Sequence, residues 1–186
     1  MSYIGLANIM TISRIPLTLI LSLLLINIET RAYAVIIFCL AICTDYLDGA
    51  IARYSKTTSE WGAIMDPVCD KILIICTLYM STIIGLIPTQ HCIAVIIIII
   101  REIFILGIRI HYISLKDNKT HQLSAIWVAK LKTILQMLAV LCVLMSLVHF
   151  DNIWITQMLL SLGYMLLWLS VIFAIYSLKS YLYLYQ

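Results

Sequence analysis

Long apolar runs separated by short polar connections fill this chain. A helix that spans a bilayer needs about 20 predominantly apolar residues, and six stretches qualify, at 10–28, 32–53, 63–86, 92–113, 125–149 and 153–178. The isoleucine-rich run 95–100 would suit a buried strand, but lipid admits only helices or closed barrels. The pattern therefore predicts an all-α integral membrane protein, a six-transmembrane-helix bundle in which residues 1–186 form a single domain.

Composition and charge support this reading. The 186 residues are 63% hydrophobic and 11% charged, whereas soluble domains are roughly 45–50% apolar and about 25% charged. The net charge is only +3, and the sequence has no basic cluster of the kind that binds nucleic acid. Six cysteines without a CxxC pair indicate neither a disulfide framework nor a zinc ribbon. Because the first apolar run lacks a small-residue cleavage site, we expect it to remain as a span.

Lysine and arginine are distributed unevenly between the two ends of the predicted spans. Arg14, the 53–56 and 116–119 connections and Lys179 fall on one side, and Arg31 alone falls on the other. Positive residues favour the cytoplasmic side of a membrane. We therefore expect both termini to face the cytoplasm.

Four aspartates interrupt the second and third apolar runs. Asp45 and Asp48 are three residues apart, and Asp66 and Asp70 are four apart, so each pair lies on one face of its helix. The short polar connection 54–61 makes the two helices antiparallel neighbours, and the four carboxylates can converge between them. Grouped carboxylates repel one another and take up protons unless cations bind between them. The spacing therefore predicts a metal site.

The ligand type indicates which metal binds. Carboxylate oxygens without nearby histidine favour hard ions, and a four-carboxylate cluster suits two divalent cations, Mg²⁺ or Mn²⁺. Cys43 and Cys69 flank the aspartates and leave zinc as a weaker alternative, because zinc sites usually combine cysteine with histidine.

Small residues follow the first aspartate pair along the helix. Gly49 lies one turn beyond Asp45, and Ala52 lies one turn beyond Asp48. They permit either the approach of a bulky ligand or close packing of helices through small residues. Arg53, one turn beyond Gly49, suits a phosphate partner or an interfacial position.

The whole segment has a recognisable form. The pattern Asp45-x2-Asp48-Gly49-x2-Ala52-Arg53-x8-Gly62-x3-Asp66-x3-Asp70 is similar to the signature of the CDP-alcohol phosphatidyltransferases, with every fixed position present. The resemblance implies six transmembrane helices, a homodimer, and a metal-dependent site on the cytoplasmic face of a bacterial inner membrane, with CMP as the leaving product. It implies that the metal ligands are Asp45, Asp48, Asp66 and Asp70, that Asp70 is also the catalytic base, and that the CDP-lipid is bound by Asn8, Thr11, Gly49, Arg53, Ser59 and Gly62. Residues 8–11 are expected just before the first span.

A second set of charges lies in the fourth and fifth runs. We predict that a phosphorylated acceptor is held by the basic residues there, Arg101, Arg109, Lys130 and Lys132. The alternative is that Arg101 and Glu102 form a buried ion pair that only stabilises the helix bundle.

A narrower resemblance indicates the acceptor. The segments 8–14, 100–103 and 129–133, with Gln136, resemble the branch of the family that uses sn-glycerol 3-phosphate. The expected reaction transfers the phosphatidyl group from CDP-diacylglycerol to sn-glycerol 3-phosphate, with membrane lipids around the site and no nucleic-acid partner. After residue 145 the chain is merely hydrophobic.

The same residues are also compatible with other functions. Cardiolipin, phosphatidylinositol phosphate and phosphatidylserine synthases of the same family are the nearest rivals. An ion or proton transporter also places carboxylates in membrane helices, but paired repeats would be expected, and no second aspartate pair follows residue 90. A purely structural subunit explains the hydrophobicity but none of the charges. The histidines lack ligand spacing and are expected to be structural or interfacial: His91, His111, His121 and His149.

The aspartate prediction can be tested with Asp48→Asn. Losing one metal-binding carboxylate should lower CMP release from the CDP-lipid at least a hundredfold, which corresponds to about 2.7 kcal/mol. The assay uses purified protein in detergent, and membrane insertion is checked by fractionation. Turnover within a few-fold of the unsubstituted protein would refute the metal role.

Overall fold

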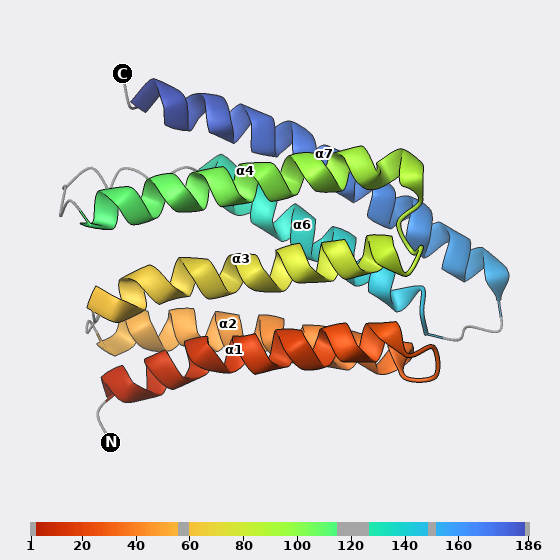
Figure 1. Ribbon diagram of the computed structural model, residues 1–186, viewed down its shortest axis with the longest axis horizontal. Coiled ribbons are helices and arrows are strands. Elements are labelled where there is room, and N and C mark those ends of the chain that lie inside the picture. The colour runs from red at the N-terminus through yellow and green to blue at the C-terminus, as the bar shows by residue number, and fades with distance from the viewer. Residues whose placement is uncertain (1–2, 56–59, 115–126, 149–151, 185–186) are drawn as a thin grey trace. The chain divides into compact units, whose positions relative to one another are not determined.

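The computed structural model describes residues 3–55, 60–114, 127–148 and 152–184, and it describes side chains at 13–44, 68–69, 71–108, 110, 131–148 and 152–178. Regular structure in these ranges is entirely helical (Figure 1). The helices are α1 (Tyr3–Ile26), the short 3-10 helix η1 (Arg31–Tyr33), α2 (Ala34–Ser55), α3 (Glu60–Ile83), α4 (Thr89–Ser114), α6 (Trp127–Met145) and α7 (Ile153–Leu184). The all-α prediction is confirmed for the residues described.

Each predicted span overlaps one of the long helices, but the ends differ. Helix α1 begins at Tyr3 and α7 continues to Leu184, whereas the apolar pattern placed these ends at 10 and 178. Asn8 and Thr11 therefore lie inside α1, and their expected place before the first span stays a prediction. An apolar window detects only the part of a helix suited to lipid, while helical hydrogen bonding can continue through polar residues beyond it.

Two of the described helices contain segments long and apolar enough to cross a membrane, at Thr89–Ile108 and Ile153–Leu178. Four shorter apolar helical stretches lie at Ser13–Ile26, Arg31–Thr44, Lys71–Ile83 and Leu131–Met145. These features are consistent with a membrane protein. The count of six spans stays a prediction.

The chain divides into two compact units, Met1–Met80 and Ser81–Gln186. In the first unit α1 packs against α2, and Figure 1 shows α3 running back antiparallel to α2. Buried Leu21, Leu25 and Phe38 form part of the apolar core of this unit. The Nε of Arg31 donates a hydrogen bond to the carbonyl of Leu25 at 2.8 Å, which satisfies an acceptor in the last turn of α1.

In the second unit α7 packs against both α6 and α4. The approach of α6 is close at Gly163: a Cβ added there would lie 2.8 Å from Val143 Cγ2 and 3.2 Å from the carbonyl oxygen of Ala139. Small residues let membrane helices come close enough for extensive van der Waals contact. Gly163 therefore sets how tightly α6 and α7 pack.

An aromatic group ties the beginning of α4 to α7. The ring of His91 stacks on Tyr164 with centroids 4.4 Å apart, and Trp168 Nε1 donates to His91 Nδ1 at 3.1 Å. The Tyr164 hydroxyl donates to the carbonyl of Leu86. The structural role expected for His91 is confirmed, while the side chains of the other three histidines lie outside the described ones.

Packing at Gly163 can be tested against a matched glycine. Gly163→Ala should destabilise the protein by about 1–3 kcal/mol, because the new methyl overlaps Val143 and a backbone oxygen. Gly107→Ala on α4 meets no atom within 4 Å and should be neutral or stabilising by up to about 1 kcal/mol. Thermal unfolding in detergent measures both, and equal effects would contradict this packing.

Candidate functional site

The four predicted metal ligands lie on two helices of the first unit. Asp45 and Asp48 are on α2, and Asp66 and Asp70 are on α3. Their side chains fall outside the described ones. Since both segments are continuous helix, the spacing keeps each pair on one helical face.

The two aspartate pairs lie at similar distances from the connection between α2 and α3. With a rise of 1.5 Å per residue, Asp45 lies about 15 Å from the end of α2 and Asp48 about 10 Å from it. Asp70 lies about 15 Å from the start of α3, and Asp66 about 9 Å from it. Because α3 follows α2 after four residues and runs antiparallel to it (Figure 1), the two pairs occupy similar levels. Their carboxylates are a donor set that fits hard divalent cations, and the metal itself stays a prediction.

The predicted CDP-lipid residues lie mostly on helices of this unit. Asn8 and Thr11 are on α1, Gly49 and Arg53 are on α2, and Gly62 is on α3. Ser59 and the side chains of the others lie outside the described residues. Their role stays a prediction.

Arg14, which the sequence pattern assigned to the cytoplasmic side of the membrane, is buried inside the protein. Its side chain is only 2% exposed, and its side of the membrane stays a prediction. Arg14 shares a buried face of α1 with Thr18, whose hydroxyl donates to the Arg14 carbonyl at 2.7 Å. Ser22, a further turn along, donates to the Thr18 carbonyl at 2.8 Å. Rules for charge at membrane ends do not report which face of a helix is packed against a neighbour.

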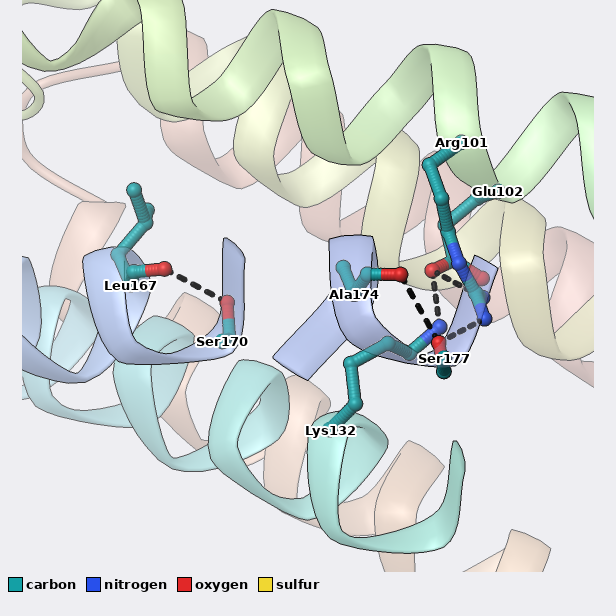
Figure 2. Close-up of polar contacts among 7 residues, drawn as sticks. All are labelled: Arg101, Glu102, Lys132, Leu167, Ser170, Ala174 and Ser177. Atoms are coloured by element: carbon teal, nitrogen blue, oxygen red, sulfur yellow. Dashed lines mark hydrogen bonds and ion pairs between the residues drawn. The ribbon is translucent and has the colours of Figure 1, made fainter. Parts of the chain in front are cut away.

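The second unit contains a buried ionic cluster, which Figure 2 shows, formed by Arg101 and Glu102 of α4, Lys132 of α6 and Ser177 of α7. Arg101 Nη1 lies 3.1 Å from Glu102 Oε1, and Lys132 Nζ donates to the same carboxylate oxygen. Arg101 Nη2 donates to the Ser177 hydroxyl at 2.6 Å. Each of these side chains is at most 5% exposed, so the cluster joins three helices inside the unit.

The described side chains of this cluster are two cations and one carboxylate. Charge buried away from water is costly unless it is compensated and hydrogen-bonded. Arginine and lysine placed together are also the usual partners of phosphate oxygens. Arg101 and Lys132 are therefore residues of the kind that binds a phosphate.

Two of the four predicted acceptor residues are brought together here, Arg101 and Lys132. Arg109 is on α4 and Lys130 is on α6, but their side chains lie outside the described ones. The alternative of an Arg101–Glu102 pair that stabilises the helix bundle also has support, because the pair exists and is bonded to Lys132 of α6 and Ser177 of α7. Phosphate binding stays a prediction.

Ser177 was missed by sequence reasoning, which treated the chain after residue 145 as merely hydrophobic. A signal was available: Gly163, Ser170 and Ser177 are spaced seven residues apart, and all three are buried. Small and hydroxylated residues at this interval mark the packed face of a membrane helix.

Comparison with known proteins identifies relatives of this chain. The family model described as CDP-alcohol phosphatidyltransferase matches residues 4–176. The chain is 35% identical over 157 residues to the CDP-diacylglycerol–glycerol-3-phosphate 3-phosphatidyltransferase of Blochmanniella floridana, covering 81% of this chain and 77% of that protein. The enzyme of the same name from Wigglesworthia glossinidia brevipalpis is 35% identical, with 82% and 78% covered. That of Escherichia coli (strain K12) is 29% identical over 155 residues, with 80% and 76% covered.

Removing the carboxylate of the cluster should destabilise the protein more than removing a cation. Glu102→Gln leaves Arg101 and Lys132 buried without their shared counter-charge and should cost about 3–5 kcal/mol. Lys132→Met leaves Glu102 paired with Arg101 and should cost less. Thermal unfolding in detergent compares them, with the exposed Glu29→Gln as the control for the same chemical change. The reverse order of stability would contradict the shared ion pair.

Proposed function

We propose an activity for this chain from one premise: it belongs to the CDP-alcohol phosphatidyltransferase family. The chain transfers the phosphatidyl group of CDP-diacylglycerol to sn-glycerol 3-phosphate and releases CMP. The observation that carries this proposal is similarity over about four-fifths of the chain to enzymes named for that reaction. The complete aspartate signature on α2 and α3 agrees with it.

The aspartates and the residues around them bind the CDP-lipid. Asp45, Asp48, Asp66 and Asp70 hold two divalent cations, Mg²⁺ or Mn²⁺, which when bound neutralise pyrophosphate oxygens and the charge that develops on departing CMP. The nucleotide part of the lipid is held by Asn8, Thr11, Gly49, Arg53, Ser59 and Gly62.

The reaction is a substitution at phosphorus. The 1-hydroxyl oxygen of glycerol 3-phosphate forms a bond to the β-phosphorus of CDP-diacylglycerol, and the bond from that phosphorus to the bridging oxygen breaks. CMP leaves with the bridging oxygen and its electron pair. Asp70 accepts the proton of the attacking hydroxyl, so its carboxylate both orients the nucleophile and acts as the base.

The acceptor phosphate is bound by the basic residues of the second unit. Arg101 and Lys132 carry the charge, and Arg109 and Lys130 on the same two helices add to it. The close contacts of Arg101 and Lys132 with Glu102 support a pre-organised site, since side chains that are already fixed lose less conformational freedom when the phosphate binds.

The physical properties of the substrates decide the place of the enzyme in the cell. The acyl chains of CDP-diacylglycerol belong in the bilayer, whereas CDP and glycerol 3-phosphate are charged and water-soluble. We therefore propose that the enzyme lies in the bacterial inner membrane with its reaction at the cytoplasmic face. The six spans and the homodimer are proposed from the family resemblance alone.

An acceptor screen on the purified protein tests the function. CMP release from CDP-diacylglycerol is followed with glycerol 3-phosphate, phosphatidylglycerol, inositol phosphate and serine, with Mg²⁺ or Mn²⁺ supplied and with EDTA as the control. Glycerol 3-phosphate should support the highest kcat/KM by at least about tenfold, because a site built for one polar group rejects acceptors that leave it unfilled. Faster release with another acceptor would assign the chain to another branch of the family.

The same assay tests the acceptor site through Lys132→Ala. This variant should raise the KM for glycerol 3-phosphate about tenfold or more, since a charge-assisted hydrogen bond contributes about 1.5–3 kcal/mol. The KM for CDP-diacylglycerol should change less than threefold. The opposite pattern would place the acceptor elsewhere.

A further inference from the structure

One buried polar side chain takes no part in the ionic cluster described above. Gln136 of α6 is 1% exposed, and among the residues that the structure describes neither its amide nitrogen nor its amide oxygen has a hydrogen-bond partner. Mutational data show that burying an amide without hydrogen-bond partners lowers protein stability by about 1–3 kcal/mol. An apolar side chain of similar size would avoid this cost, so the amide calls for an explanation other than packing.

The position of Gln136 connects it to the basic residues. It lies four residues after Lys132 in α6, so the two side chains are neighbours on one helical face, with Cβ atoms about 5–6 Å apart. Both belong to the buried stripe of α6, which continues through Ala139, Val140 and Val143. The unpartnered amide is therefore adjacent to the cation that bonds to Glu102.

Buried hydroxyls on the helix packed against α6 are already engaged. Ser170 donates to the carbonyl of Leu167 at 2.7 Å, and Ser177 donates to that of Ala174 at 2.9 Å, as Figure 2 shows. Ser177 also accepts from Arg101. Both hydroxyl protons are thus used within α7.

We propose that Gln136 is a specificity-determining residue that hydrogen bonds the hydroxyl on the second carbon of the acceptor. The inference rests on the proposed function, in which Arg101 and Lys132 hold the phosphate of glycerol 3-phosphate. That hydroxyl is three bonds from the phosphoester oxygen, so a phosphate bound at Lys132 brings it to the neighbouring turn of α6. An amide both donates and accepts hydrogen bonds, as a hydroxyl does. The acceptor then satisfies the amide that has no partner among the described residues.

The test compares glycerol 3-phosphate with 3-hydroxypropyl phosphate, which keeps the phosphate and the attacking hydroxyl but lacks the second one. The unsubstituted protein should favour glycerol 3-phosphate by about tenfold or more in kcat/KM, since an acceptor without the hydroxyl leaves the buried amide unpaired. Gln136→Met keeps the length of the side chain and removes the amide. In this variant the kcat/KM for glycerol 3-phosphate should exceed that for 3-hydroxypropyl phosphate by no more than about threefold. The kcat/KM for 3-hydroxypropyl phosphate should be unchanged or higher.

Controls separate this role from a structural one. Gln157→Met makes the same change at an exposed position of α7 and should keep the full preference. The melting temperature of Gln136→Met should equal or exceed that of the unsubstituted protein, because an unpaired buried amide has been removed. Gln136→Leu repeats the comparison if the methionine protein fails to fold.

Each result has a definite meaning. An equal loss of activity with both acceptors, or a preference that survives in both Gln136 variants, would overturn the role of Gln136 while leaving the proposed function intact. If the unsubstituted protein releases CMP with glycerol 3-phosphate but shows no preference over 3-hydroxypropyl phosphate, the hydroxyl is not sensed and the inference fails. If it releases CMP with neither, the proposed function itself fails.

Discussion

Charge inside a helical bundle that excludes water must be compensated within the protein, and this requirement governs the second unit. Glu102 is fully buried and bonds to both Arg101 and Lys132. A bare ion in such surroundings would cost several kcal/mol, so none of these three residues is stable there alone. The ion pairs therefore favour an arrangement of α4 and α6 in which these three side chains meet.

Close packing and the ionic cluster support each other. Gly163 lets α6 and α7 approach, and the Ser177 hydroxyl on α7 accepts a hydrogen bond from Arg101 on α4. Hydrophobic attraction between helices is weak when lipid competes for the same surfaces, so close contact and polar bonds carry more of the stability. The residues that fix the helices are thus also the residues proposed to bind the acceptor phosphate.

The proposed reaction explains why a membrane protein would keep so many costly polar groups. Its substrates are a lipid with a charged headgroup and a soluble phosphorylated alcohol, so binding sites for charge must be built at the edge of an apolar bundle. Carboxylates grouped as predicted for α2 and α3 would repel one another without cations, and the buried amide of Gln136 has no hydrogen-bond partner among the described residues. In the proposed function a ligand compensates both, cations in the first case and a hydroxyl in the second.

The sequence alone determined the helices and the spacing of the aspartates, because hydropathy and helical periodicity depend on residues close together in the chain. The aspartate signature also predicted the family, which the comparisons confirmed over residues 4–176. Only the tertiary structure revealed that Arg14 is buried, that Glu102 is shared by two cations, and that Ser177 completes the cluster. The contacts of Glu102 with Lys132 and of Arg101 with Ser177 join residues 30 and 76 positions apart. Such contacts depend on which helical faces pack together, and no local pattern in the chain records that choice.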